Sequence, residues 1–156
     1  AVSSALPVAP TVNARAIGDA PRFATGPTPP RYWPLDEPGF ITRGMVGDST
    51  PDESHPGVDI AVPEGSVVRA SGGGTVAATG TDAEYGEFVL IDHPAGYQSM
   101  YGHLSRVLAV RGAVIQPGEV LGLSGNTGRS TAPHLHFEVR HGGRSIDPLI
   151  LVKETR

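Results

Sequence analysis

Two histidines separated by one residue lie in the segment HLHFEVR, residues 134–140, where polar and apolar residues alternate without exception. In a strand, the polar side chains of this segment would share one face and the apolar ones would face the core. His134 and His136, about 7 Å apart, could then reach one small site, one as a metal ligand and the other as an acid or base. Glu138 would share their face, either as an acceptor for an imidazole N–H or as a solvated carboxylate. The alternative is that the whole polar face is simply solvated.

A histidine and an aspartate four residues apart occur in the segment HPGVD, residues 55–59. Metal sites without cysteine use such ligands, and a catalytic zinc site takes three protein ligands and keeps one position for water. His55 and Asp59 with either His134 or His136 would complete three ligands, and the remaining histidine would lie beside the metal. Taken alone, the segment is also typical of a loop histidine next to a structural aspartate.

A third candidate, His103, follows a Tyr-Gly pair at the expected end of a strand. Glycine permits close backbone approach at such a position, and site residues are often presented there. A structural or surface histidine is the alternative. Of the other histidines, His93 closes a strand and is predicted to make structural hydrogen bonds. His141 precedes two glycines in an expected hairpin turn and is predicted to be solvated.

Short β-branched segments separated by glycine turns must position these side chains. From Val58 onward such segments follow one another at hairpin spacing, and no helical pattern of ten residues interrupts them. The chain has 156 residues, 38% of them apolar, which is enough to fill one core. We therefore expect an all-β fold, a small antiparallel β-sandwich or partly open barrel of short, glycine-punctuated strands.

Proline and glycine are distributed differently along the chain, since 11 of the 15 prolines precede Glu64 and 15 of the 21 glycines follow it. Residues 1–40 contain no sustained period of 3.6 or 2 and are predicted to form an extended, Pro-rich arm. We expect this arm to pack on the body or on a neighbour, anchored by Phe23, Tyr32 and Trp33. The functional domain would then comprise residues 41–156.

Composition excludes several classes of protein and site. There is no cysteine, so any metal site must use histidine and carboxylate ligands. The net charge of −4 comes without a basic stripe, which argues against nucleic-acid binding. No apolar run approaches the roughly 20 residues of a membrane span. Because the chain begins at Ala1 rather than Met, we expect a processed or excised form, from which a signal peptide or anchor could have been removed.

Three ordered segments together resemble the lysostaphin and LytM type of zinc metallopeptidase, whose members cut peptide bonds in peptidoglycan. The resemblance runs from about residue 41 to residue 148. Its segments are HPGVDIAVPEGSVVRASGGGTV, then YGEFVLIDHPAGYQSMYGHLS, then VIQPGEVLGLSGNTGRSTAPHLHFEVR with a closing IDP.

The resemblance implies a zinc ion held by His55, Asp59 and His136, with His103 and His134 as catalytic residues that do not bind the metal. Zinc would activate a water molecule, and the two free histidines would act as acid and base. One would take the proton of the water, and the other would stabilise the oxyanion or protonate the leaving amine. Which histidine does which is left open.

The loop before the paired histidines resembles a groove-wall loop of the same family. Its candidate substrate-binding residues are Asn126, Arg129, Ser130 and Thr131, although turn formation alone would also explain Asn and Gly there. Some members place a tyrosine shortly upstream of the first ligand, but residues 40–54 contain none. Tyr32, Tyr97 or another group would have to take its place.

The function implied is a zinc-dependent endopeptidase that hydrolyses peptide cross-links of bacterial peptidoglycan, in the periplasm or elsewhere in the cell envelope. The alternative is a catalytically silent member that acts as a scaffold or activator of other wall hydrolases. Such members usually lack one or more ligands, whereas this chain retains the full set. A lipoyl or biotinyl carrier domain would need a lysine at a hairpin tip, and the single lysine, Lys153, lies near the C-terminus. The partner would be the peptide stems of peptidoglycan, and the oligomeric state is left open.

Overall fold

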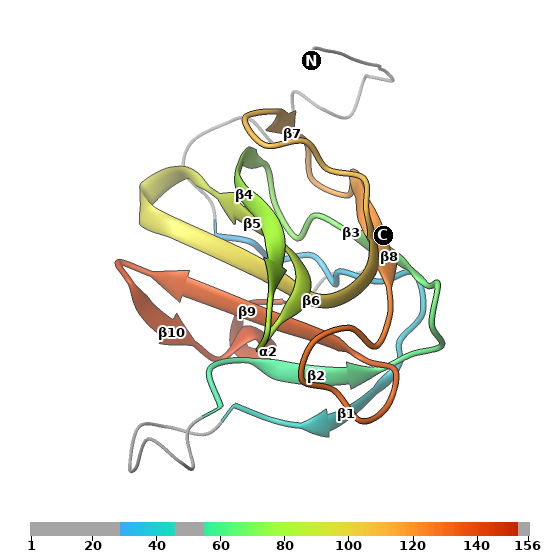
Figure 1. Ribbon diagram of the computed structural model, residues 1–156. Coiled ribbons are helices and arrows are strands. Elements are labelled where there is room, and N and C mark those ends of the chain that lie inside the picture. The colour runs from blue at the N-terminus through green and yellow to red at the C-terminus, as the bar shows by residue number, and fades with distance from the viewer. Residues whose placement is uncertain (1–28, 46–54, 153–156) are drawn as a thin grey trace.

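Antiparallel strands make up almost all of the regular structure in the computed structural model, which describes residues 29–45 and 55–152 (Figure 1). The strands are β1 (Phe40–Arg43), β2 (Val58–Ala61), β3 (Val67–Arg69), β4 (Gly74–Asp82), β5 (Gly86–Asp92), β6 (Tyr97–Val107), β7 (Val114–Ile115), β8 (Val120–Ser124), β9 (Leu135–His141) and β10 (Arg144–Ile146). Two short helical segments accompany them, the 3-10 turn η2 (Pro94–Gly96) and the four-residue α2 (Pro148–Leu151). Within the described residues no helix is long and apolar enough to cross a membrane.

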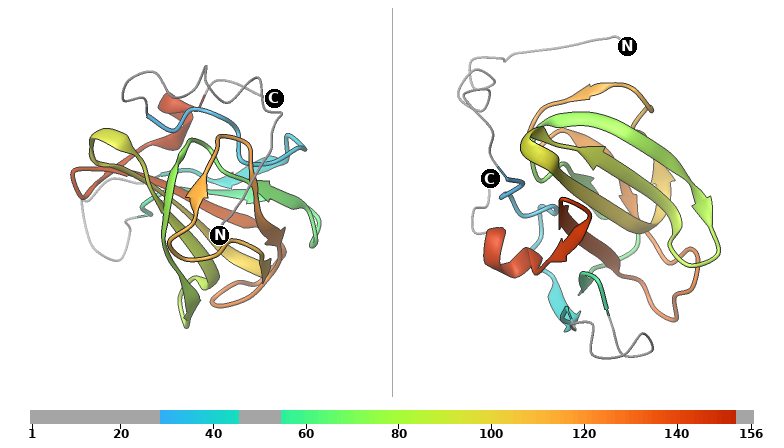
Figure 2. Two further views of the ribbon diagram at one scale, coloured as in Figure 1. Left: turned by 90° about the horizontal axis from the view of Figure 1, so that it is seen from above. Right: turned by 90° about the vertical axis from the view of Figure 1, so that its left-hand side faces the viewer.

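The strands form one open sheet in the order β1-β2-β9-β6-β5-β4-β7, with β10 added to β9 and β8 joining β6 to β3. Every pairing is antiparallel, and the sheet bends strongly so that the β4–β5 hairpin curves over its neighbours (Figure 2). The prediction of an all-β antiparallel fold is therefore confirmed. The sheet is open and does not close into a barrel.

The core lies against the apolar faces of β2, β6 and β9. Leu135, Phe137 and Val139 of β9 are fully buried, as their alternation with polar residues predicts, and they pack in one cluster with Ile60 and Tyr101. The opposite face of β9 is also covered, because His136 is 3% exposed and Glu138 is 0% exposed. The alternative of a solvated polar face is therefore wrong. The β4–β5 turn, which contacts Glu138, contributes to this cover.

The described end of the predicted arm, residues 29–37, packs on the body. The backbone N–H groups of Arg31 and Tyr32 both donate to the carbonyl of Ser71 at 3.0 Å, and Leu35 pairs with Val68 in an isolated β-bridge. Trp33 packs on the core cluster. The third predicted anchor, Phe23, lies outside the described residues. The division of the chain at residue 40 stays a prediction.

Candidate active site

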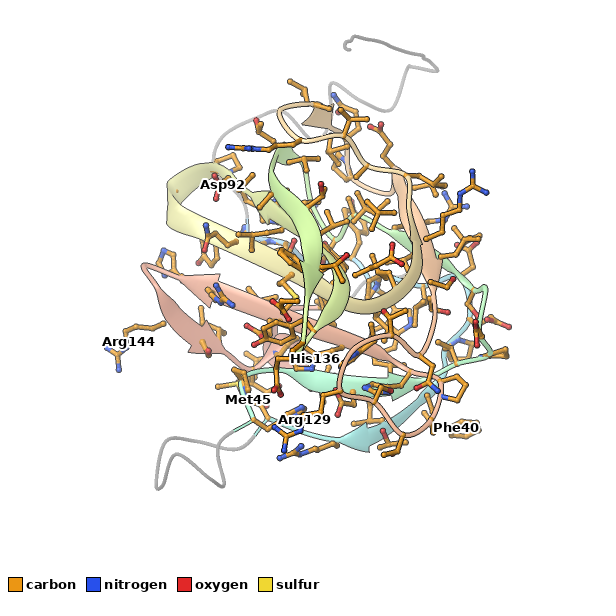
Figure 3. The ribbon with its side chains drawn as sticks, in the orientation of Figure 1. Phe40, Met45, Asp92, Arg129, His136 and Arg144 are labelled. Carbon is orange, nitrogen blue, oxygen red and sulfur yellow. The ribbon has the colours of Figure 1, made fainter. Side chains whose placement is uncertain are left out.

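The centre of the site is built on two neighbouring strands, β2 and β9. Their register places Asp59 opposite His136, so the two side chains form a cross-strand pair on the face away from the apolar core. On the other side of β9, Gly102 of β6 is the register partner of His136. Figure 3 shows His136 near the lower end of the β4–β5 hairpin, with Arg129 nearby on the loop that precedes β9.

Three side chains converge closely enough to hold one metal ion. One ligand atom from each of His55, Asp59 and His136 lies within 4.8 Å of the other two. His55 Nε2 is 3.3 Å from Asp59 Oδ2, and His136 Nδ1 is 2.8 Å from Asp59 Oδ1. The two histidines are 6% and 3% exposed, so the cluster is largely screened from solvent.

The hydrogen bonds around this cluster leave the right nitrogens for a metal. The Nδ1–H of His55 donates to the carbonyl of Gly44 at 3.0 Å, and the Nε2–H of His136 donates to Glu138 Oε1 at 2.9 Å. Each ring thereby directs its second nitrogen at Asp59, and that of His136 shares a proton with Asp59 Oδ1 at 2.8 Å, which a metal ion would replace. Two imidazoles and one carboxylate, with the histidines held by outer acceptors, fit a catalytic zinc ion with one open position.

His103 lies next to this cluster because of a bulge in β6. The register with β5 gains one residue on β6 between Tyr101 and Leu104, and His103 takes φ +61°, a left-handed conformation that is costly outside glycine. Its backbone N–H donates to the Tyr85 carbonyl at 2.6 Å, and its Nδ1–H donates to the Thr127 carbonyl at 2.7 Å. These two bonds fix the ring, and in its neutral form they leave Nε2 without a proton.

His134 is held in the same manner from the opposite side. Its Nδ1–H donates to the Ala132 carbonyl at 2.8 Å, with Ser130 Oγ at 3.1 Å, while its Nε2 lies 3.6 Å from Asp59 Oδ1. The ring centroids of His103 and His134 are 4.5 Å apart. The structure therefore brings all five predicted metal-binding and catalytic residues into one cluster.

Burial and charge act against each other on the titrating groups of the site. Burial alone would raise the pKa of Asp59, but its hydrogen bond to His136 and the charges of the nearby histidines lower that pKa overall. For His136, burial favours the neutral ring, but the bonds to Asp59 and Glu138 raise its pKa. The pKa of His103 is lowered, first by burial and then by the neighbouring histidines. His103 is thus tuned toward the neutral form that a base requires.

The loop before β9 presents its predicted substrate-binding residues unequally. Asn126, Arg129 and Thr131 are exposed, and Arg129 pairs at 3.4 Å with Glu84 of the β4–β5 turn. Ser130 is half-buried, and its hydroxyl donates to Asn126 Oδ1 at 2.5 Å. Ser130 also contacts His134 Nδ1 at 3.1 Å, so in this structure its hydroxyl is used within the site.

Tyr85, in the β4–β5 turn, reaches the site and was missed by the sequence analysis. Its hydroxyl donates to Glu138 Oε1 at 2.9 Å, and its ring centroid lies 5.4 Å from that of His136. The two tyrosines suggested as substitutes for the family's upstream tyrosine lie elsewhere. Tyr32 is buried beside Ser71, and Tyr97 stacks on His141. No spacing in the sequence signals Tyr85, because its partner lies 53 residues further on.

The two histidines predicted to lie outside the site do so. His93 is buried and structural, since its ring bonds the Gly73 carbonyl at 2.8 Å and the Ser99 hydroxyl at 2.7 Å. Its role as a hydrogen-bonding residue is confirmed. His141 is exposed, as expected, and also contacts the Ala95 carbonyl at 3.1 Å.

A buried cluster of two histidines and an aspartate, flanked by two further imidazoles, is the kind of site that zinc hydrolases use. Comparison with known proteins agrees with this class. The family model "Peptidase family M23" matches residues 53–148. Peptidoglycan DD-endopeptidase ShyA of Vibrio cholerae is 42% identical over 95 residues, which are 61% of this chain and 22% of that protein.

Solved structures show the same likeness. A zinc-containing peptidase from Vibrio cholerae has a TM-score of 0.71 at 30% identity, covering 84% of this chain and 41% of that one. The catalytic domain of lysostaphin from Staphylococcus simulans has a TM-score of 0.64 at 28% identity, covering 74% of this chain and 91% of that one. The chain belongs to peptidase family M23, and the resemblance to lysostaphin-type peptidases is confirmed. The chain spans less than a quarter of the length of the first curated relatives that it matches.

Proposed function

We propose that this protein is a zinc-dependent endopeptidase that hydrolyses peptide cross-links of bacterial peptidoglycan. The observation that supports this most is the convergence of His55, Asp59 and His136, with the free Nε2 atoms of His103 and His134 on the same cluster. The names of the relatives, which include a peptidoglycan endopeptidase and a zinc-containing peptidase, support the same class of substrate and metal.

The proposed role of each residue follows from its position in the site. Zinc, when bound, would polarise the scissile carbonyl and lower the pKa of a coordinated water. His55, Asp59 and His136 would hold it and leave one position open. Nε2 of His103 or His134 accepts the proton released during attack, and Nε2 of the other donates a proton to the leaving amine or a hydrogen bond to the oxyanion.

The exposed side of the site would receive the peptide stem. Asn126, Arg129 and Thr131 lie on the loop that borders the catalytic histidines, and Ser130 supports His134 from the same loop. Peptidoglycan as substrate places the protein in the bacterial cell envelope, periplasmic or secreted. We further propose that residues 41–156 form the peptidase domain and residues 1–40 an arm associated with it.

A silent scaffold or activator of other wall hydrolases is the competing function. Such a protein has no need to keep both free histidines with one ring nitrogen fixed and the other free, as His103 and His134 are here. Metal analysis of the purified protein separates the two proposals, because the endopeptidase should hold one zinc per chain and Asp59→Asn should hold none. Digestion of purified sacculi of both common cross-link types, with products identified by mass, would then name the bond. A parent protein without zinc and without released peptides would contradict the proposal.

A further inference from the structure

Glu138 is a fully buried carboxylate with four hydrogen bonds from three residues. Oε1 accepts from His136 Nε2–H at 2.9 Å and from the Tyr85 hydroxyl at 2.9 Å. Oε2 accepts from Arg140 Nε–H at 3.0 Å and Nη2–H at 2.9 Å. The side chain is 0% exposed, so water does not replace any of these partners.

Such a carboxylate constrains the imidazole that it contacts. An ionised carboxylate can only accept hydrogen bonds, so the His136 nitrogen facing it must carry a proton. Nδ1 is then the nitrogen directed at Asp59 Oδ1, 2.8 Å away, and it is the atom that a metal ion would bind in place of the proton it shares with Asp59. Leaving a buried carboxylate without its partners is costly, so the ring is held in one orientation.

Tyr85 and Arg140 in turn hold the carboxylate. Arg140 is on the same strand as Glu138 and engages Oε2 through two N–H groups, which supplies the opposite charge. Tyr85 comes from the β4–β5 turn and closes the remaining side of Oε1. The Tyr85 hydroxyl points at Glu138 and is therefore committed to this network.

We propose that Glu138 is a positioning residue that holds the His136 ring with Nε2–H directed at Glu138 and Nδ1 directed at Asp59, and that Tyr85 and Arg140 hold Glu138 in place for this purpose. This inference rests on the zinc site of the proposed function. It assigns a task to Tyr85, which connects the β4–β5 turn to the metal-binding face of β9.

The test measures zinc affinity and the His136 tautomer, both independent of hydrolysis. In the purified protein, Glu138→Gln should weaken zinc binding by about 10- to 100-fold in competition with a chelator. Nitrogen-15 NMR of the zinc-loaded parent should show His136 with Nε2 protonated and Nδ1 bound to the metal, and the zinc-loaded variant should show a mixture of tautomers. Tyr85→Phe, which removes one bond from a half-buried side chain, should change both readouts in the same direction by a smaller amount.

Ser99→Ala provides a matched control for the loss of a buried hydrogen bond. Ser99 bonds His93 at 2.7 Å and the Tyr101 hydroxyl at 2.7 Å, away from the metal cluster. This variant should lose thermal stability and keep parental zinc affinity. If Ser99→Ala weakens zinc binding as much as Glu138→Gln does, the effect is general destabilisation and the inference is wrong.

Two further outcomes separate this inference from the proposed function. The inference would be overturned if Tyr85→Phe, and any folded Glu138→Gln, kept a zinc affinity within twofold of the parent and an unchanged His136 tautomer. This holds whatever the peptidase activity. A parent that binds zinc with the expected tautomer and cleaves no peptidoglycan would instead overturn the proposed function and leave the positioning role supported.

Discussion

Each imidazole of the site has one nitrogen bonded to a fixed acceptor. His55, His103 and His134 donate to the backbone carbonyls of Gly44, Thr127 and Ala132, whereas His136 donates to the Glu138 carboxylate. The remaining nitrogen of each ring faces the inside of the site, where that of His136 contacts Asp59 Oδ1 at 2.8 Å. Among these four histidines, only His136 donates to a charged acceptor. His55, the other proposed histidine ligand, donates to a backbone carbonyl, as the two proposed catalytic histidines do.

His103 is expected to serve the reaction without binding the metal. His103→Ala should keep one zinc per chain and lower kcat by about 10²- to 10⁴-fold, the usual contribution of a general acid or base. Metal analysis and the rate of peptide release measure the two effects on one preparation. Near-parental hydrolysis in this variant would remove His103 from the catalytic pair.

The buried ring of His93 should make stability depend on pH. Its pKa is lowered from 6.5, chiefly by burial, with the Gly73 carbonyl bond offsetting part of the effect. Below pH 6.5 the unfolded chain therefore binds a proton that the folded chain excludes, so stability falls as the pH drops toward the lowered folded pKa. The loss has an upper limit of about 1.4 kcal/mol for each pH unit of this window.

Urea unfolding of the metal-free protein at pH 7.5 and pH 5 measures this effect. In His93→Gln the difference in unfolding free energy between the two pH values should be smaller than in the parent. An equal or larger difference would show that His93 does not contribute to the acid sensitivity.

At the scale of elements, the loop before β9 is locked to the β4–β5 turn and to β6. The Thr127 hydroxyl donates to the Leu104 carbonyl at 2.6 Å and accepts from the Glu87 N–H at 3.1 Å. The Thr127 carbonyl also holds His103. The loop, the neighbouring strands and His103 are therefore connected by hydrogen bonds through Thr127.

Gly128→Ala should disturb this connection without touching a metal ligand. Gly128 has φ +73°, and a Cβ there would collide with the backbone of Gly86. A left-handed conformation costs a residue with Cβ about 1–2 kcal/mol even without the collision. We expect a lower kcat, because the anchor of His103 shifts, with zinc affinity close to that of the parent. Gly112→Ala is the control, since Gly112 has φ +88° and open space around it; an equal loss of activity in both variants would contradict the loop mechanism.

The strands of the site could be predicted from the sequence better than their surroundings. The strict alternation in residues 134–140 predicted β9 and its core-facing side chains, because a strand has a period of two. The cover over its second face depends on the β4–β5 turn, which lies far away in the sequence. The left-handed backbone of His103 depends on a bulge in the pairing of β5 with β6. No local pattern encodes either contact.

At the scale of the whole molecule, residues 29–37 tie the start of the described chain to β3. Leu35 is 3% exposed and belongs to the core cluster, and Asp36 pairs with Arg69 at 2.7 Å. Leu35→Ala should lower the free energy of unfolding by about 2–4 kcal/mol, the usual cost of such a cavity. Zinc affinity should not change, since the residue lies away from the metal cluster. Urea unfolding and chelator competition measure the two effects. A free energy of unfolding within about 0.5 kcal/mol of the parent, the usual range for surface substitutions, would show that this segment packs loosely.

The functional set was only partly accessible from the sequence. Residue chemistry suggested a metal site with histidine and aspartate ligands, but the choice between His134 and His136 came from the family resemblance. The structure supplies a physical reason for that choice, since ligand atoms of His55, Asp59 and His136 converge within 4.8 Å of one another, a set that among the described residues does not include His134. Tyr85 needed the three-dimensional fold, because a lone tyrosine in a turn carries no spacing signal.

The most direct test of the account is the appearance of new amino groups in purified sacculi treated with zinc-loaded protein. The parent should release new peptide amino termini steadily, and Asp59→Asn, with its isosteric amide, should release none above the background of untreated sacculi. Equal release by both proteins, or none by a parent that holds one zinc per chain, would contradict the claim that His55, Asp59 and His136 form the metal centre of a peptidoglycan endopeptidase.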